Sequence, residues 1–158
     1  MTIRVFFTGG RFRRFFFAFA VSLLLSFLIG SPARAAELLS FDGLYKSNTV
    51  LGLKFADRTL ALKGQVVRLR GYMAPPLKPE SNFFVLTREP VAICPFCSSD
   101  GEWPVDIVVV YASKTVIPTN FSERIEAEGL LEVGSFIDPK TGFVSQLRIR
   151  DAVFHTSN

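Results

Sequence analysis

The only two cysteines of the chain stand close together, in the segment Cys94-Pro95-Phe96-Cys97. Thiols at this spacing can form a disulfide, exchange disulfides with another protein or bind a soft metal ion. Three interpretations therefore stay open: a local disulfide, a redox pair, and a metal site suited to zinc or cuprous copper. Zinc and copper are the only cofactors that the sequence brings into consideration.

The cysteine spacing limits each interpretation. A disulfide would close a ring of four residues. Loop entropy predicts that such a ring stabilises the folded state by about 2 kcal/mol, so the disulfide would mainly determine the local conformation of the loop. Cys-Pro-x-Cys resembles the active sites of thiol-disulfide oxidoreductases. In those proteins the first cysteine opens a helix, whereas residues 98–104 form a turn sequence that leads into a strand. A closed zinc site needs two further ligands, and the only histidine, His155, is expected at the opposite end of the domain.

The first 35 residues have the three parts of an export signal. Four arginines precede the apolar stretch 15–29, which is shorter than the 18 or more residues of a membrane span, and Ala33-Arg34-Ala35 offers a cleavage pattern. We therefore expect a signal peptide at 1–35, cleavage before Ala36, a periplasmic location, and no stable membrane anchor after cleavage. The export route and the oligomeric state stay open.

Removing the signal peptide reverses the net charge. Five of the eighteen basic residues and none of the fourteen acidic residues lie in it, so the remaining 123 residues carry thirteen basic and fourteen acidic side chains. The basic character of the whole chain gives no argument for a nucleic acid or an anionic membrane as partner. A length of 123 residues fits one domain, residues 36–158.

Apolar residues recur mostly at period two, which indicates a mainly β domain. A lead-in with one short helix or strand around 48–55 is expected to precede the strands, and residues 137–142 read as a hairpin turn. The predicted strands are 66–73, 82–87, 106–111, 124–133 and 143–154.

Five strands with Gly71 and Gly129 inside two of them resemble the OB-fold, a five-stranded Greek-key barrel. In that fold the fourth strand lies between the first and the fifth. Acidic side chains of the fourth strand would then face basic side chains on both neighbours, as exposed cross-strand pairs. The acidic residues are Glu126, Glu128 and Glu132, and the basic residues are Arg68, Arg70, Arg148 and Arg150.

OB-folds often bind oligonucleotides across the second and third strands. Segments 82–87 and 106–111 contain no arginine or lysine, although nucleic-acid binders of this kind present a positive groove. We therefore expect no nucleic acid partner.

Several motifs resemble a family of uncharacterised exported bacterial proteins with a Gly-aromatic-Met-x-Pro motif. They are Gly71-Tyr72-Met73-Ala74-Pro75, the run 84–87, the cysteine loop, the run 103–108 and Thr141-Gly142-Phe143. The resemblance covers nearly the whole mature chain and implies one exported OB-fold-like domain, in some members accompanying a transport system. One part of the family has Cys-x-His with a proline run at this loop, where this chain has Cys94-Pro95-Phe96-Cys97.

The cysteine loop, residues 88–105, is long for a connection without its own secondary structure, and such loops usually have a function. The resulting hypothesis is a non-catalytic periplasmic binding or assembly module. Its cysteine loop would meet a metal or a periplasmic or inner-membrane protein through Phe96, Trp103 and Tyr72. The alternative is a small thiol-redox or metal-relay protein that uses Cys94 and Cys97.

Overall fold

Strands dominate the chain where apolar and polar residues alternate. The strands are β1 (Glu37–Leu39), β2 (Tyr45–Thr49), β3 (Gly52–Phe55), β4 (Val66–Met73), β5 (Phe83–Thr87), β6 (Ile107–Ala112), β7 (Arg124–Ile137) and β8 (Val144–Thr156). Two short helices, η2 (Phe41–Gly43) and α2 (Asp57–Ala61), lie among the first strands. The five strands predicted from period two are β4 to β8, with ends that differ by a few residues.

This computed structural model describes residues 35–49, 52–75, 82–92 and 103–157. The chain divides into two units, residues 1–34 and 35–158, and every described residue belongs to the second. The predicted signal peptide therefore lies outside the described residues. Within them, every helix is too short or too polar to span a bilayer.

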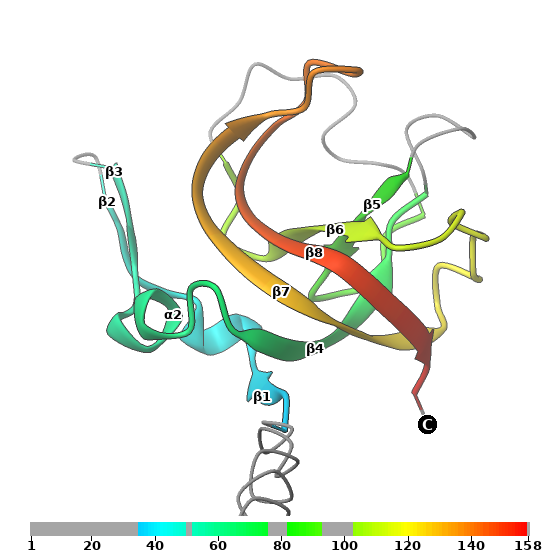
Figure 1. Cartoon of the computed structure of the whole chain (residues 1–158), viewed down its shortest axis with the longest axis horizontal. Helices are drawn as coiled ribbons and strands as arrows, with labels where there is room; N and C mark the ends of the chain where they lie inside the picture. The colour runs from blue at the N-terminus through cyan, green and yellow to red at the C-terminus, as the bar shows by residue number, and fades with distance from the viewer. Residues whose placement is uncertain (1–34, 50–51, 76–81, 93–102, 158) are drawn as a thin grey trace, which may run out of the picture. The chain divides into compact units, whose positions relative to one another are not determined.

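The domain is mainly β, as predicted, and its principal element is a mixed six-stranded sheet. The strand order is β1-β4-β5-β6-β8-β7, and β4 also pairs with β7. The β1–β4 and β6–β8 pairs are parallel, whereas β4–β5, β5–β6, β7–β8 and β4–β7 are antiparallel. Strands β7 and β8 run together as two long curved ribbons (Figure 1).

The main core lies on the inner face of these strands. In β4, Val67, Leu69 and Met73 are buried, while the residues between them are more exposed. Strands β5 and β6 differ because almost all of their residues are buried on both faces. Phe84 and Leu86 of β5 and Val108 and Val110 of β6 face the main core.

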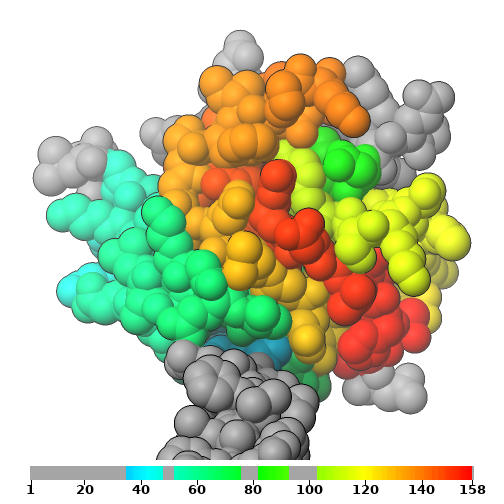
Figure 2. Space-filling model, viewed as in Figure 1, coloured from blue at the N-terminus to red at the C-terminus, as the bar shows by residue number. Residues whose placement is uncertain are grey.

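The outer faces of β5 and β6 form a second apolar layer. Phe83, Val109 and Tyr111 cluster there, and Trp103, Phe136 and Phe143 pack against them. The turn between β7 and β8 lies at the predicted residues. A hydrogen bond joins this turn to β6, because the Tyr111 hydroxyl donates to Asp138 Oδ2 at 3.1 Å. The turn extends over the top of the molecule in Figure 2.

The turn itself is organised around the Asp138 carboxylate. Asp138 Oδ1 accepts from the backbone N–H of Lys140 and Thr141 and from the Thr141 hydroxyl. These donors and Tyr111 stabilise the charged carboxylate against its burial, so the pKa of Asp138 is lowered. Burial and the neighbouring Asp138 raise the pKa of Tyr111 to about 12.

The predicted charge pairing across β7 is confirmed for Glu126 and Glu132, but Glu128 makes no ion pair with the described residues. Strand β7 pairs with both β4 and β8. Glu126 contacts Arg70 at 2.6 Å and Arg68 at 3.6 Å, and Glu132 contacts Arg148 at 3.0 Å. The expectation that these side chains are exposed is wrong for two of them, because Glu126 and Arg148 are each only 5% exposed. Arg148 donates to the carbonyls of Gly134 and Ser145, and its guanidinium lies 4.9 Å from the centre of the Phe136 ring.

The lead-in is more structured than predicted. Residues 48–49 and 52–55 belong to an antiparallel pair of strands, β2 and β3, and α2 follows this pair. Strand β1 adds to the main sheet beside the first half of β4. In Figure 1 the β2–β3 hairpin projects to one side of the sheet, so we refer to it as the arm.

Gly71 is required by close packing. A Cβ there would lie 2.5 Å from the Thr87 carbonyl oxygen. The backbone of β5 would have to move to remove this steric clash. We expect Gly71→Ala to reduce the free energy of unfolding by about 1–3 kcal/mol, measured by denaturant titration. Gly43→Ala is the control, because nothing lies within 4 Å of that position. Equal effects of the two substitutions would contradict the packing argument.

Glu126 links stability to pH. The hydrogen bond from Arg70 is the largest cause of its lowered pKa. A lowered pKa in the folded state stabilises the fold above the unfolded pKa, and this contribution is lost as the pH falls through the folded pKa. We expect Glu126→Gln to reduce the free energy of unfolding by about 1–3 kcal/mol near neutral pH and by much less at a pH well below the ordinary pKa of a glutamate, where the carboxyl group is protonated.

Glu128→Gln is the matched control for that measurement. Glu128 stands opposite Arg68 in the register of β4 and β7, but it makes no ion pair with the described residues. Denaturant titration of both variants at the two pH values separates a specific pair from a general charge effect. A loss for Glu126→Gln that is independent of pH would rule out the linkage.

Candidate functional site

Both ends of the cysteine loop are anchored at one point of the sheet. The loop follows β5 and leads into β6, and the Arg88 backbone N–H donates to the Asp106 carbonyl at 3.0 Å. The Thr87 hydroxyl adds a bond of 2.7 Å to the Glu89 carbonyl. Cys94, Phe96 and Cys97 lie outside the described residues, so the predicted disulfide, redox and metal roles concern residues whose geometry is not described.

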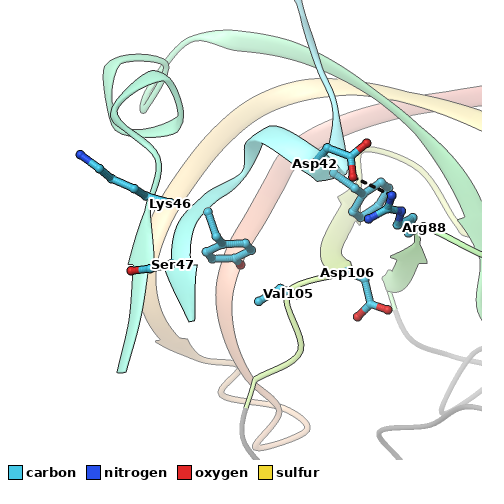
Figure 3. Close-up of a pocket in the computed structure, with 8 residues that line it drawn as sticks. Asp42, Lys46, Ser47, Arg88, Val105 and Asp106 are labelled. Atoms are coloured by element: carbon cyan, nitrogen blue, oxygen red, sulfur yellow. Dashed lines mark ion pairs between the residues drawn. The ribbon is translucent and has the colours of Figure 1, made fainter. Parts of the chain in front are cut away.

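A surface pocket of about 260 Å³ lies where the loop ends meet the arm. We call it the stem pocket. Figure 3 shows Asp42 and Arg88 paired on one side of it, with Asp106 below them and Lys46 pointing away. Its lining residues are Phe41, Asp42, Tyr45, Lys46, Ser47, Arg88, Val105 and Asp106.

Trp103 joins the second loop end to the arm. Its indole N–H donates to the Tyr45 hydroxyl at 2.8 Å, and its ring packs on the outer layer of β5 and β6, which includes Val85 and Ile107. The Tyr45 ring stacks on Phe55 of the neighbouring strand, with ring centres 5.2 Å apart. Burial raises the pKa of Tyr45 to about 12, although the bond from Trp103 acts in the opposite direction. The pocket therefore has a neutral aromatic wall.

Two of the charged groups that line the stem pocket form an exposed ion pair. Arg88 and Asp42 form an ion pair of 2.6 Å, but both side chains are about half exposed or more. Such surface pairs stabilise a fold little and are available to charged ligands. Lys46 pairs instead with Asp57 at 3.5 Å. Among the described residues, no group of three or more metal-binding side chains comes together.

The two predicted contact residues within the described ranges are placed differently. Trp103 bonds to a wall of the stem pocket. Tyr72 stands opposite Thr87 of β5 and Arg124 of β7, and it does not line the pocket. Tyr72 instead reaches the first loop end through its backbone, because its carbonyl accepts from the Thr87 hydroxyl at 3.2 Å.

The pocket residues from η2 and the arm were not predicted from the sequence. Phe41 and Tyr45 lie in the lead-in, far from Arg88 and Asp106 along the chain. The only sequence signal is the pair of aromatic residues within a polar stretch, because their position at the loop ends depends on the long-range pairing of β1 with β4. Nothing in the sequence indicated that Asp42 and Arg88 form an ion pair.

The bond between Trp103 and Tyr45 can be tested directly, because Trp103 is the only tryptophan. We expect Tyr45→Phe to leave the indole N–H without its partner and to lower the free energy of unfolding by about 1 kcal/mol. The Trp103 fluorescence emission should shift in the same variant. Tyr72→Phe is the matched control, because no described side chain bonds to the Tyr72 hydroxyl. An unchanged emission spectrum for Tyr45→Phe would contradict the assignment.

Comparison with known proteins gives one structural relative. No protein-family model matches the chain, and no curated protein matches it. The crystal structure of a DUF3299 family protein from Pseudomonas aeruginosa PAO1 is similar, with a TM-score of 0.55 and 14% sequence identity over 78% of this chain and 97% of that one. At this identity the likeness concerns the fold alone.

Proposed function

We propose that this protein is a non-catalytic binding or assembly module of the periplasm, in which the cysteine loop and the stem pocket together engage a partner. The observation that carries the proposal is the double anchoring of the loop. Its two ends are joined by the bond between Arg88 and Asp106 and are tied to the arm by the bond between Trp103 and Tyr45. A loop held in this way by a rigid sheet is a common arrangement for binding residues.

The proposed architecture is an OB-fold-like Greek-key barrel of β4, β5, β6, β8 and β7. The pairing of β4 with β7 supports it, because this contact adds the fifth junction to a ring of five strands. The antiparallel β4–β7 pair and the parallel β6–β8 pair are those expected of the fold, in which the fourth strand lies between the first and the fifth. The export signal and the resemblance to the exported Gly-aromatic-Met-x-Pro family belong to the same proposal.

A protein partner fits the described surface better than a nucleic acid does. The outer faces of β5 and β6, where OB-folds often bind oligonucleotides, are covered by Trp103, Phe143 and Phe136. The stem pocket beside them carries Arg88 together with Asp42 and Asp106, so it is not a basic groove. The partner in this proposal is a periplasmic or inner-membrane protein, with a transport system as one setting.

The second candidate is a thiol-redox or metal-relay protein using Cys94 and Cys97. It is favoured by one specific observation, the Cys-Pro-Phe-Cys spacing in the segment between two anchored loop ends. A relay needs a reactive, exposed thiolate, whereas a shaped loop needs a stable disulfide. The two candidates therefore differ in the chemical state of the cysteines.

The partner proposal is tested by photo-crosslinking in intact cells. A photoreactive amino acid at position 96 should give a defined adduct with one envelope protein, and Trp103→Ala should weaken that adduct because it releases the loop from Tyr45. The same photoreactive group at Lys140, in the β7–β8 turn, is the matched control. Identical adducts at both positions, or none at position 96, would rule out a loop-specific partner.

The chemical state of Cys94 and Cys97 is tested on protein purified from the periplasm without reductant or chelator. Intact mass should show a chain that begins at Ala36 and has lost two hydrogens, with no bound metal by elemental analysis. Stoichiometric zinc or copper with free thiols would instead favour the metal-relay candidate. A chain recovered only from the cytoplasm with residues 1–35 intact would overturn the periplasmic assignment.

A further inference from the structure

The end of β8 extends beyond its neighbour β6. The two strands are parallel, and their pairing ends at Ala112 and Ala152. At that point the chain leaves the sheet, and the Ser113 backbone N–H and hydroxyl both donate to the Ala152 carbonyl, at 2.9 and 3.1 Å. Strand β8 continues to Thr156 and pairs there with β7 alone. Residues 153–156 therefore have one edge without a neighbouring strand among the described residues.

The backbone groups on this open edge can be assigned from the hydrogen bonds that flank it. The Ser157 N–H donates to the Arg124 carbonyl at 2.8 Å, so Ser157 directs its backbone groups toward β7. Because this direction alternates along an antiparallel strand, His155 also faces β7, while Phe154 and Thr156 face the open edge. The Ala152 carbonyl points away from β7, because it accepts from Ser113 on the other side of β8. Counting alternate residues from Ala152 also places Phe154 and Thr156 on the open edge.

A groove of about 480 Å³ runs along the open edge. Its second wall is the segment after β6, which includes Ile117 and Pro118. The Ile117 and Val153 side chains are 75% and 55% exposed, which leaves apolar surface on both walls. In Figure 2 the groove lies where the yellow segment around 113–121 meets the red end of β8.

The groove also has a charge preference. Lys114 and His155 both line it, and Lys114 makes no ion pair with the described residues. A ligand that fills the groove would therefore gain from a carboxylate near Lys114. Exposed strand edges recruit extended peptides through backbone hydrogen bonds, and pockets beside the edge select alternate side chains.

From these features we infer that the open edge of β8 is a strand-addition site for an extended segment of a partner protein. The segment has apolar side chains at alternate positions and an acidic residue that reaches Lys114. Its backbone pairs with Phe154 and Thr156, and its apolar side chains lie against Ile117 and Val153. This site is at the opposite end of β6 from the stem pocket, so it does not depend on the function proposed for the cysteine loop.

The open edge is tested first in the protein alone, by amide hydrogen exchange of the full chain as its host processes it. The Phe154 and Thr156 amides should exchange at least tenfold faster than the His155 amide, whose partner is β7. Equal protection of the three amides would mean that the edge is already paired, and it would overturn the inference.

The ligand class is tested with peptides selected from a random twelve-residue library on the same protein. Selected peptides should have alternating apolar residues with an acidic residue, and they should shift the Phe154 and Thr156 amide resonances. Thr156→Pro removes the N–H on the open edge, at a position where proline is tolerated because that N–H does not face β7. It should weaken peptide binding about tenfold or more, whereas Thr156→Ala, which keeps the N–H, should bind normally.

Ile117→Asp provides a second variant that leaves the strand untouched. Ile117 is highly exposed, so the substitution should not affect folding, but it places a negative charge in the wall that an acidic peptide must approach. It should weaken binding as Thr156→Pro does. The inference is overturned if no peptide is enriched, or if both variants bind the selected peptides as tightly as the unchanged protein.

Discussion

Strands β5 and β6 are apolar on both faces, and removing their outer faces from water is the constraint on which the rest of the domain depends. A sheet with one solvated face would need polar residues at alternate positions, whereas Phe83, Val109 and Tyr111 occupy them here. The long β7–β8 hairpin covers part of this face, and Trp103 covers another part. The position of Trp103, and with it the end of the cysteine loop, therefore follows from hydrophobic burial.

The same constraint separates the surface into two regions with different chemistry. At the start of β6, the stem pocket combines an aromatic wall with the exposed ion pair of Asp42 and Arg88. At the end of β6, the groove combines apolar side chains with backbone groups of β8 that pair with no described strand on that edge. The first region is formed by side chains on ordered loop ends, and the second by the difference in length between two neighbouring strands. The two regions lie at opposite ends of β6, so the two proposed binding sites do not overlap.

The sequence was sufficient for the strands and for the charge pairing across β7, because both depend on alternation within one segment. It was not sufficient for the burial of Glu126 and Arg148, since their covering depends on neighbouring strands and on the curvature of the β7–β8 hairpin. The stem pocket was missed because Tyr45 and Arg88 are brought together only by long-range pairing. Trp103 was singled out from the sequence because it stands in the long connection between two predicted strands.

The pairing of β4 with β7 also has a consequence for the rate at which the domain forms. Arg70 and Glu126, which join these strands, are 56 residues apart in the sequence. Contacts between distant segments form slowly, because the entropy of closing the intervening loop opposes them until the other strands are in place. A nascent chain with this topology stays unfolded for longer than a chain of local hairpins. Such a delay would suit a protein that crosses a membrane before it folds.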